Sequence, residues 1–304
     1  MKWTSFLFAL LVAFAVTPAE AYRLEPYKDD LFKYPRILGT AHSGSMVIVE
    51  FDDARDVGGR DEIRLKKAYD KFVDLSVNDA KKDLTIEDKV KVRYVGVGQT
   101  EGDAKMVVIY LHGRHGDRTL AQEDLRFGGN FNRVKNLMWR NDGVYITPDF
   151  SNFGRRGVEE MKALMRYYRK NSPDAPIVIA GASTGAQLIY RLMSDPEAVE
   201  LLDGIILHGP LRVGRGVDRG FFDQPVFTDP SKHIPIYIGH ASADPTVPWP
   251  TSELFMEKVK AAAPGYPIRF ELFKGTDAVH GTPIRMMDWR LVLNWILEQN
   301  EALS

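Results

Sequence analysis

Residues 176–185 read Pro-Ile-Val-Ile-Ala-Gly-Ala-Ser-Thr-Gly, and they contain the pattern that decides the fold. The β-branched apolar run predicts a strand, the small residues after it predict a sharp turn, and the stretch beyond Gly185 predicts a helix. Ser183 lies at the apex of that turn, within the G-x-S-x-G pattern that places a nucleophilic serine between a strand and a helix. The alternative interpretation is an ordinary turn serine that caps the helix.

The strand and helix patterns alternate along the chain, which predicts an α/β fold with a mostly parallel central sheet flanked by helices. Continuous apolar runs are typical of strands buried on both faces, whereas the run at 90–97 alternates as a half-buried antiparallel strand does. We expect strands at 46–51, 90–97, 106–111, 144–146, 177–180, 204–207, 234–239 and 268–273, and helices at 60–73, 155–170, 252–262 and 284–298.

The composition favours one large domain. Residues 22–304 are enough for a substantial core, with 22–100 forming an N-terminal extension with antiparallel edge strands and 105–304 the catalytic core. The chain has no cysteine, which excludes disulfides, thiolate metal sites and a cysteine nucleophile. The formal net charge of −1, with no basic stripe, argues against nucleic-acid binding.

The first 21 residues predict a secretory signal peptide. Lys2 precedes an apolar run over 3–16, and Ala-Glu-Ala at 19–21 forms a cleavage site. Cleavage after Ala21 would give a secreted or periplasmic chain that begins at Tyr22, without stable membrane insertion. An uncleaved membrane anchor is the alternative, although the run is shorter than the ~20 residues of a spanning helix.

A serine nucleophile needs a base, and the base needs an acid that orients it. Asp244 follows the expected strand at 234–239, where its carboxylate can project over the end of the sheet. Asp277 is the main rival because it is close to a histidine in sequence, and Asp223 is a weaker one. A turn aspartate with a local role is the other reading of Asp244.

His280 is the candidate base. It lies in the loop between the last expected strand and the final helix, so its position matches that of Asp244. The order Ser183, Asp244, His280 is the one expected for a serine triad on a sheet of this kind. A structural histidine is the alternative.

The oxyanion of a tetrahedral intermediate requires two N–H donors. We expect the backbone N–H of Thr184 to be one and that of Arg114, in the His-Gly-Arg loop after the strand at 106–111, to be the other. His112 and His115 in this loop have the spacing of a zinc pair, but i,i+3 ligands require a helix and the glycines predict a loop. We therefore expect no metal site.

Together these residues resemble the α/β-hydrolase superfamily, from about residue 106 to the C-terminus. The pattern Asp-x-x-Val-Pro at 244–248 and the pair His280-Gly281 are similar to the carboxylesterase, acyl-thioesterase and dienelactone-hydrolase branch. The resemblance implies a cofactor-free serine hydrolase that acts on a small-molecule or acyl ester, a thioester or an amide. Ser183 would be the nucleophile, His280 the base and then the acid, and Asp244 the orienting carboxylate.

The chain departs from many members of the family between 208 and 233, which is rich in Gly, Arg and Pro and has no evident large helical lid. The arginines of the 212–219 loop could meet an anionic group of the substrate, or simply face solvent. Phenylalanines in the same region could line an acyl pocket or anchor the loop. These residues are Arg212, Arg215, Arg219, Phe221, Phe222 and Phe227.

The leading prediction is a secreted or periplasmic serine esterase. A peptidase or amidase with the same triad is a second possibility, and a non-catalytic binding protein on a hydrolase scaffold is a third, of a different class. The sequence does not decide the substrate or the oligomeric state.

Overall fold

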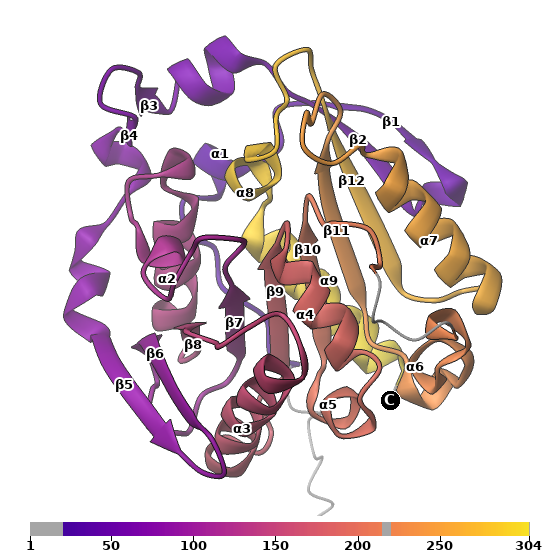
Figure 1. Cartoon of the computed structure of the whole chain (residues 1–304). Helices are drawn as coiled ribbons and strands as arrows, with labels where there is room; N and C mark the ends of the chain where they lie inside the picture. Colours follow the sequence, from indigo (N-terminus) through magenta and orange to yellow (C-terminus); the bar gives the residue numbers. More distant parts are fainter. Residues whose placement is uncertain (1–20, 215–219, 304) are drawn as a thin grey trace, which may run out of the picture.

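The computed structural model of the chain describes residues 21–214 and 220–303. These residues form a central ten-stranded sheet (Figure 1). The strand order is β1-β2-β12-β11-β10-β9-β7-β8-β6-β5. The strands are β1 Ile37–Ala41, β2 Met46–Glu50, β5 Lys81–Glu87, β6 Lys91–Gly98, β7 Val107–Leu111, β8 Val144–Pro148, β9 Ile177–Ala182, β10 Gly204–His208, β11 Ile236–Ala241 and β12 Ile268–Lys274. A separate two-stranded sheet joins β3 Asp61–Glu62 to β4 Lys67–Ala68.

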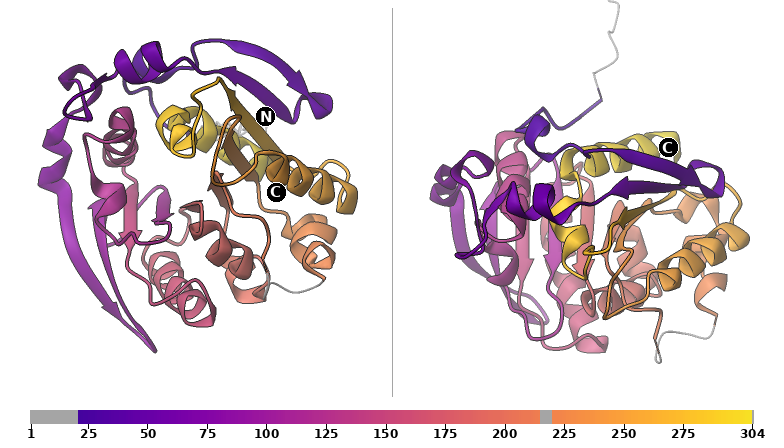
Figure 2. Two further views of the ribbon diagram at one scale, coloured as in Figure 1. Left: turned by 45° about the horizontal axis from the view of Figure 1, so that its top comes forward. Right: turned by 90° about the horizontal axis from the view of Figure 1, so that it is seen from above.

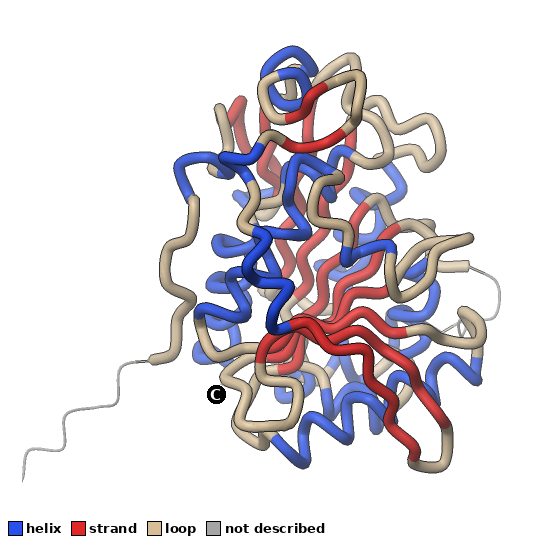
Figure 3. Tube along the Cα trace, turned by 90° about the vertical axis from the view of Figure 1, so that its left-hand side faces the viewer, coloured by secondary structure: helices blue, strands red, loops and turns tan. Residues whose placement is uncertain are grey.

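The central part of the sheet is parallel. All neighbours from β2 to β8 pair in parallel, whereas β1 with β2, β8 with β6 and β6 with β5 pair antiparallel. Figure 3 views the sheet from its β5 edge and shows the twist that is usual for such sheets. The prediction of a mostly parallel sheet flanked by helices is confirmed.

Helices cover both faces of the sheet because the side chains of each strand alternate between two cores. On β7, Val107 and Ile109 belong to the core under α3, α4 and α7, whereas Val108 and Tyr110 belong to the core under α2 and α9. The α-helices are α1 Asp29–Phe32, α2 Asn130–Arg140, α3 Arg155–Asn171, α4 Gly185–Leu192, α5 Pro196–Leu201, α6 Pro225–Thr228, α7 Pro250–Ala262, α8 Thr282–Met286 and α9 Trp289–Leu303.

Residues 51–80 connect β2, the second strand at one side of the sheet, to the edge strand β5 at the opposite side. They leave β2 beside β12 and enter β5 at the far edge, so this N-terminal arm passes around the molecule (Figure 2). On the way Asp61 forms an ion pair with Arg285 of α8, and the backbone of Asp74 bonds to Asn132 of α2. The arm therefore braces the two helices that flank the loop containing His280 and the loop after β7.

The helix predicted over 60–73 is wrong. This segment contains β3, β4 and a 3-10 turn at Asp70–Phe72, and Lys66 has a positive φ of 52°. Ile63 and Leu65, two of the apolar residues of the segment, are 58% and 59% exposed. A buried ion pair explains why this segment is not a helix, because Asp61 pairs with Arg285 of α8 rather than with a neighbour on a helix of its own.

The single closing helix predicted over 284–298 is also wrong, since the structure divides it into α8 and α9. Met287 has an extended ψ of 127°, and Asp288 accepts a hydrogen bond from the N–H of Leu291 at the start of α9. Asp288 also pairs with the buried Arg133 at 2.9 Å. This ion pair holds the break in place.

The sequence patterns did not predict β1, β5 or α2. The apolar residues of α2 have the spacing of an amphipathic helix, but its polar side chains face the N-terminal arm and the loop after β7 instead of solvent. Asn132, Arg133 and Lys135 are fully buried, and Lys135 pairs with Asp124 at 2.7 Å.

No helix in the described ranges is long and apolar enough to cross a membrane. Residues 1–20 of the signal peptide predicted over 1–21 lie outside the described residues.

Candidate active site

Ser183 lies in the tight turn between β9 and α4, as predicted. Its φ of 52° is in the left-handed region, a strained conformation for a residue with a side chain. Gly185 allows the turn, because a Cβ there would come within 2.9 Å of the Leu111 carbonyl oxygen and 3.0 Å of that of His112. The N–H of Ser183 donates to the carbonyl of His208 at 2.9 Å, which ties the turn to the end of β10.

Asp244 and His280 come together at the same edge of the sheet. They follow the neighbouring strands β11 and β12, and His280 Nδ1 lies 2.6 Å from Asp244 Oδ2. A carboxylate can only accept, so Nδ1 carries the hydrogen and Nε2 is left with a free lone pair. The carboxylate has no exposed surface, whereas the imidazole is partly exposed. The imidazole is therefore oriented as a general base requires.

A second histidine, His240, contacts the same carboxylate. Its Nε2 lies 3.3 Å from Asp244 Oδ2 and 2.9 Å from the carbonyl oxygen of Val247, so this nitrogen is the donor. Its Nδ1 then accepts from the hydroxyl of Ser252 in α7 at 2.8 Å. His240 is fully buried, and it connects the acid to the first turn of α7.

Four donors surround the Asp244 carboxylate. Besides the two histidines, the backbone N–H groups of Thr246 and Val247 donate to Oδ1 at 2.8 and 3.0 Å. Burial alone would raise the pKa of Asp244, but these hydrogen bonds outweigh burial and hold that pKa well below its usual range. The side chain is therefore an anion at neutral pH.

The two rival acids lie elsewhere. Asp277 is exposed and accepts a hydrogen bond from the Thr276 hydroxyl, and Asp223 is exposed in the short turn Phe221–Asp223. His280 is hydrogen-bonded to Asp244 and to neither rival among the described residues.

The end of β10 joins the serine to the acid–base pair. Gly209 has a φ of 49°, and a Cβ on it would lie 3.2 Å from the His280 ring and 3.5 Å from Asp244 Oδ2. The residue before it, His208, accepts the Ser183 N–H. Within the described part of the chain the Ser183 hydroxyl makes no hydrogen bond, which is common for a catalytic serine without its substrate.

The loop after β7 lies against the serine. A Cβ at Gly113 would be 3.6 Å from Ser183 Cβ, and the N–H groups of Arg114 and Thr184 have no acceptor among residues 21–214 and 220–303. Both predicted oxyanion donors are thus near the turn and unengaged.

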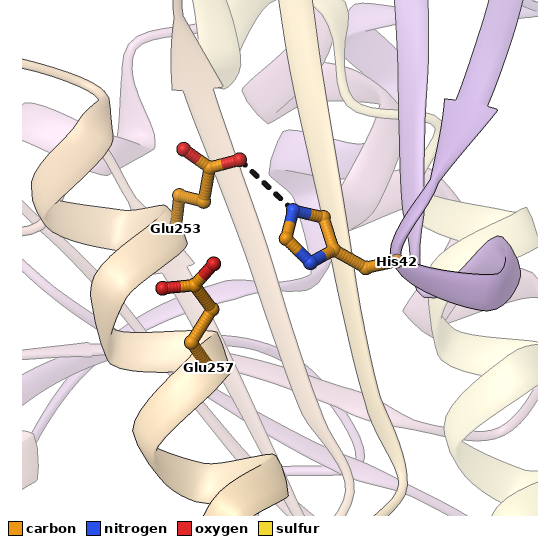
Figure 4. Close-up of side chains that lie close together, drawn as sticks. All are labelled: His42, Glu253 and Glu257. Atoms are coloured by element: carbon orange, nitrogen blue, oxygen red, sulfur yellow. Dashed lines mark hydrogen bonds and ion pairs between the residues drawn. The ribbon is translucent and has the colours of Figure 1, made fainter.

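His112 and His115 do not form a metal site with a third ligand in the described residues. The His112 ring stacks on Phe150 with 4.3 Å between ring centroids, and its Nδ1 donates to the Gly113 carbonyl. One group that could hold a cation, His42 with Glu253 and Glu257, lies between the β1–β2 turn and α7 (Figure 4). There His42 Nε2 is 2.9 Å from Glu253 Oε1, a contact that fastens the hairpin to the helix.

The residues predicted in the loop after β10 differ in burial. Phe221 and Phe227 are buried anchors, Phe222 is half-buried, and Arg212 is exposed. Arg215 and Arg219 lie outside the described residues.

Sequence reasoning missed two residues near the acid. His240 is four residues before Asp244 at the end of the same strand, and that position is the signal that could have identified it. No sequence signal identifies Gly209, because its importance arises from the approach of His280 in space.

Solved structures of several esterases resemble this chain. A thermostable esterase aligns with a TM-score of 0.54 at 22% identity, over 73% of this chain and 64% of that one. A Pyrococcus furiosus esterase aligns with a TM-score of 0.50 at 18% identity, over 72% and 92%. A Pyrococcus horikoshii acylaminoacyl peptidase aligns with a TM-score of 0.50 at 14% identity, over 70% and 40%. No protein-family model and no curated protein matches the sequence.

These similarities, with the sheet order and the helices on both faces, show that the chain has the α/β-hydrolase fold. The chain spans 64% of the length of the thermostable esterase. The fold predicted from the sequence is confirmed.

The close packing of Gly185 against two backbone carbonyl oxygens predicts that a larger residue there destabilises the fold. Gly185→Ala should lower the free energy of unfolding by about 1–3 kcal/mol, because its Cβ meets backbone oxygens that cannot rotate away. Gly39→Ala is the matched control, since no atom lies within 4 Å of its added Cβ. Urea unfolding measures both, and equal stabilities would contradict the packing described here.

Proposed function

We propose that this chain is an exported serine hydrolase that cleaves carboxylic esters or thioesters through an acyl-enzyme. The observation that carries the proposal is the 2.6 Å hydrogen bond from His280 to the buried Asp244, made beside a serine in a strained turn. A buried anion that orients an imidazole serves to activate a nucleophile. The esterases of similar fold add support for an ester substrate.

The first half of the reaction forms the acyl-enzyme. His280 Nε2 takes the proton of the Ser183 hydroxyl while Oγ attacks the carbonyl carbon, and Asp244 stabilises the resulting imidazolium. The N–H groups of Arg114 and Thr184 bind the oxyanion of the tetrahedral intermediate. As the intermediate collapses, the C–O bond to the alcohol breaks and His280 protonates the leaving group.

The second half releases the acid. A water molecule replaces the alcohol, His280 removes its proton, and the hydroxide attacks the acyl carbon. The second tetrahedral intermediate collapses with return of the proton to Ser183 Oγ. No cofactor takes part in this proposal.

A peptidase or amidase is the second candidate, because the same residues cleave amides and a peptidase is among the proteins of similar fold. Ester and amide hydrolysis differ in the leaving group, since the amine of an amide must be protonated before it departs. Turnover of 4-nitrophenyl esters and of aminoacyl 4-nitroanilides by one preparation separates them.

Export rests on the signal peptide expected over 1–21. The residues just after it contact the folded domain: the Tyr22 hydroxyl donates to the Asn141 carbonyl at 2.8 Å, and Arg23 pairs with Glu301. Expression of the full chain in a bacterium should give periplasmic protein whose N-terminal residue, by mass spectrometry, is Tyr22. An intact N-terminus in the cytoplasm would refute export.

Ser183 is tested by covalent labelling. A fluorophosphonate should label the wild-type protein rapidly, and Ser183→Ala should abolish both labelling and ester turnover, because the hydroxyl forms the covalent bond. Circular dichroism of the variant checks that it is folded. A folded wild-type protein that is not labelled would favour the non-catalytic binding protein.

Asp244 is tested against its main rival. Asp244→Asn should lower kcat by about 10⁴-fold, as expected when the orienting carboxylate of a triad is lost. Asp277→Asn should leave kcat within about twofold, because among the described residues this exposed side chain is hydrogen-bonded only to Thr276. Steady-state kinetics on one ester decides, and the reverse pattern would move the acid to Asp277.

A further inference from the structure

A groove of about 350 Å³ lies between α7 and the loop that follows β10. Its lining combines exposed cations with apolar side chains and contains no carboxylate. The residues that matter here are Arg212, Val213, Phe222, Leu254, Phe255 and Lys258.

The groove adjoins the nucleophile through a short stretch of backbone. The N–H of Leu211 donates to the Ser183 carbonyl at 3.2 Å, and this hydrogen bond ties the start of the loop to the serine turn. Gln187, in the first turn of α4, donates to the Arg212 carbonyl at 2.7 Å and holds the next part of the loop. The residues that line the groove on this side therefore come directly after the residue that is bonded to the serine turn.

Neither cation of the groove has an acidic partner among the residues that the structure describes. The Arg212 guanidinium makes no ion pair or hydrogen bond with any residue that the structure describes. Lys258 contacts only the face of the Phe222 ring, with Nζ 5.4 Å from its centroid, within the same ranges. The acids of α7, Glu253 and Glu257, lie on the side of the helix that faces His42 (Figure 4). Within 21–214 and 220–303, no carboxylate therefore neutralises the positive charge of the groove.

The floor between the cations is apolar. Phe222 packs on Phe255 with ring centroids 5.7 Å apart, and Leu254 remains 51% exposed at the rim. Such a surface suits a short hydrocarbon chain, whose burial is favourable by about 0.8 kcal/mol per CH₂ group. An anionic end on that chain would meet Arg212 and Lys258.

We propose that this groove binds an acidic arm of the substrate, a short hydrocarbon chain that ends in a carboxylate. The inference rests on the proposed function and narrows it to hydrolysis of esters of dicarboxylic acids with one free acid group. Arg212 and Lys258 set this specificity by charge, and Phe222 and Leu254 contact the carbon chain. Neither cation takes part in bond cleavage.

A matched pair of esters tests the proposal. 4-Nitrophenyl hydrogen adipate and 4-nitrophenyl hexanoate have acyl chains of equal length and differ in the terminal carboxylate. The measured quantity is the ratio of their kcat/KM values, with turnover by Ser183→Ala subtracted for spontaneous hydrolysis. The wild-type ratio should exceed one and fall as sodium chloride is raised, because salt screens exposed charges.

Charge removal should lower the ratio selectively. Arg212→Gln and Lys258→Gln should each lower it about threefold to fivefold and the double variant about tenfold, because each substitution removes one exposed charge that attracts the carboxylate. Leu254→Asp, which puts a negative charge at the rim, should also lower the ratio. Lys274→Gln is the control, since Lys274 is an exposed cation at the end of β12 outside the groove, and it should leave the ratio unchanged.

The outcomes separate the two proposals. A protein that labels at Ser183 and hydrolyses the hexanoate, but whose ratio is the same in all variants, overturns the groove assignment and leaves the serine hydrolase intact. Equal decreases in Arg212→Gln and Lys274→Gln also overturn it, because they indicate general attraction rather than a site. A folded wild-type protein that neither labels nor hydrolyses either ester overturns both.

Discussion

The buried carboxylate of Asp244 is the constraint on which the catalytic end of the molecule depends. An unsolvated anion is costly unless each lone pair is satisfied, and here two imidazoles and two backbone N–H groups share it. Three of these donors come from β11 and the loop that follows it, whereas the fourth, His280, comes from the loop after the neighbouring strand β12. The three local donors stabilise the Asp244 carboxylate, and this carboxylate in turn orients the His280 imidazole.

The rest of the fold supplies the neighbours of that charge. Parallel pairing of β9, β10, β11 and β12 places their carboxyl ends side by side, so that the loops after them converge. Close backbone approaches at Gly185 and Gly209 then set the distances between the loops. At those two positions a methyl group would separate the parts of the site.

The sequence predicted the central strands and the triad candidates because both depend on local signals: unbroken apolar runs, and polar residues just after them. It failed over 60–73 and within 284–298, where ion pairs of Asp61 with Arg285 and of Asp288 with Arg133 decide the backbone path. It also missed α2, whose polar side chains are buried against the N-terminal arm. The role of Gly209 and the contact of His240 with Asp244 depend on residues that meet only in the folded structure, so no local sequence pattern predicts them.

The pairing of β2 with β12 has a kinetic consequence. Met46 aligns with Phe270, so a strand near the start of the chain finds its parallel partner only when the last strand has emerged. Pairings between such distant segments form late and slow folding, because a long loop must close first. The edge of β2 that faces β12 therefore stays unpaired until β12 has been synthesised, and chaperones can bind this exposed edge until then.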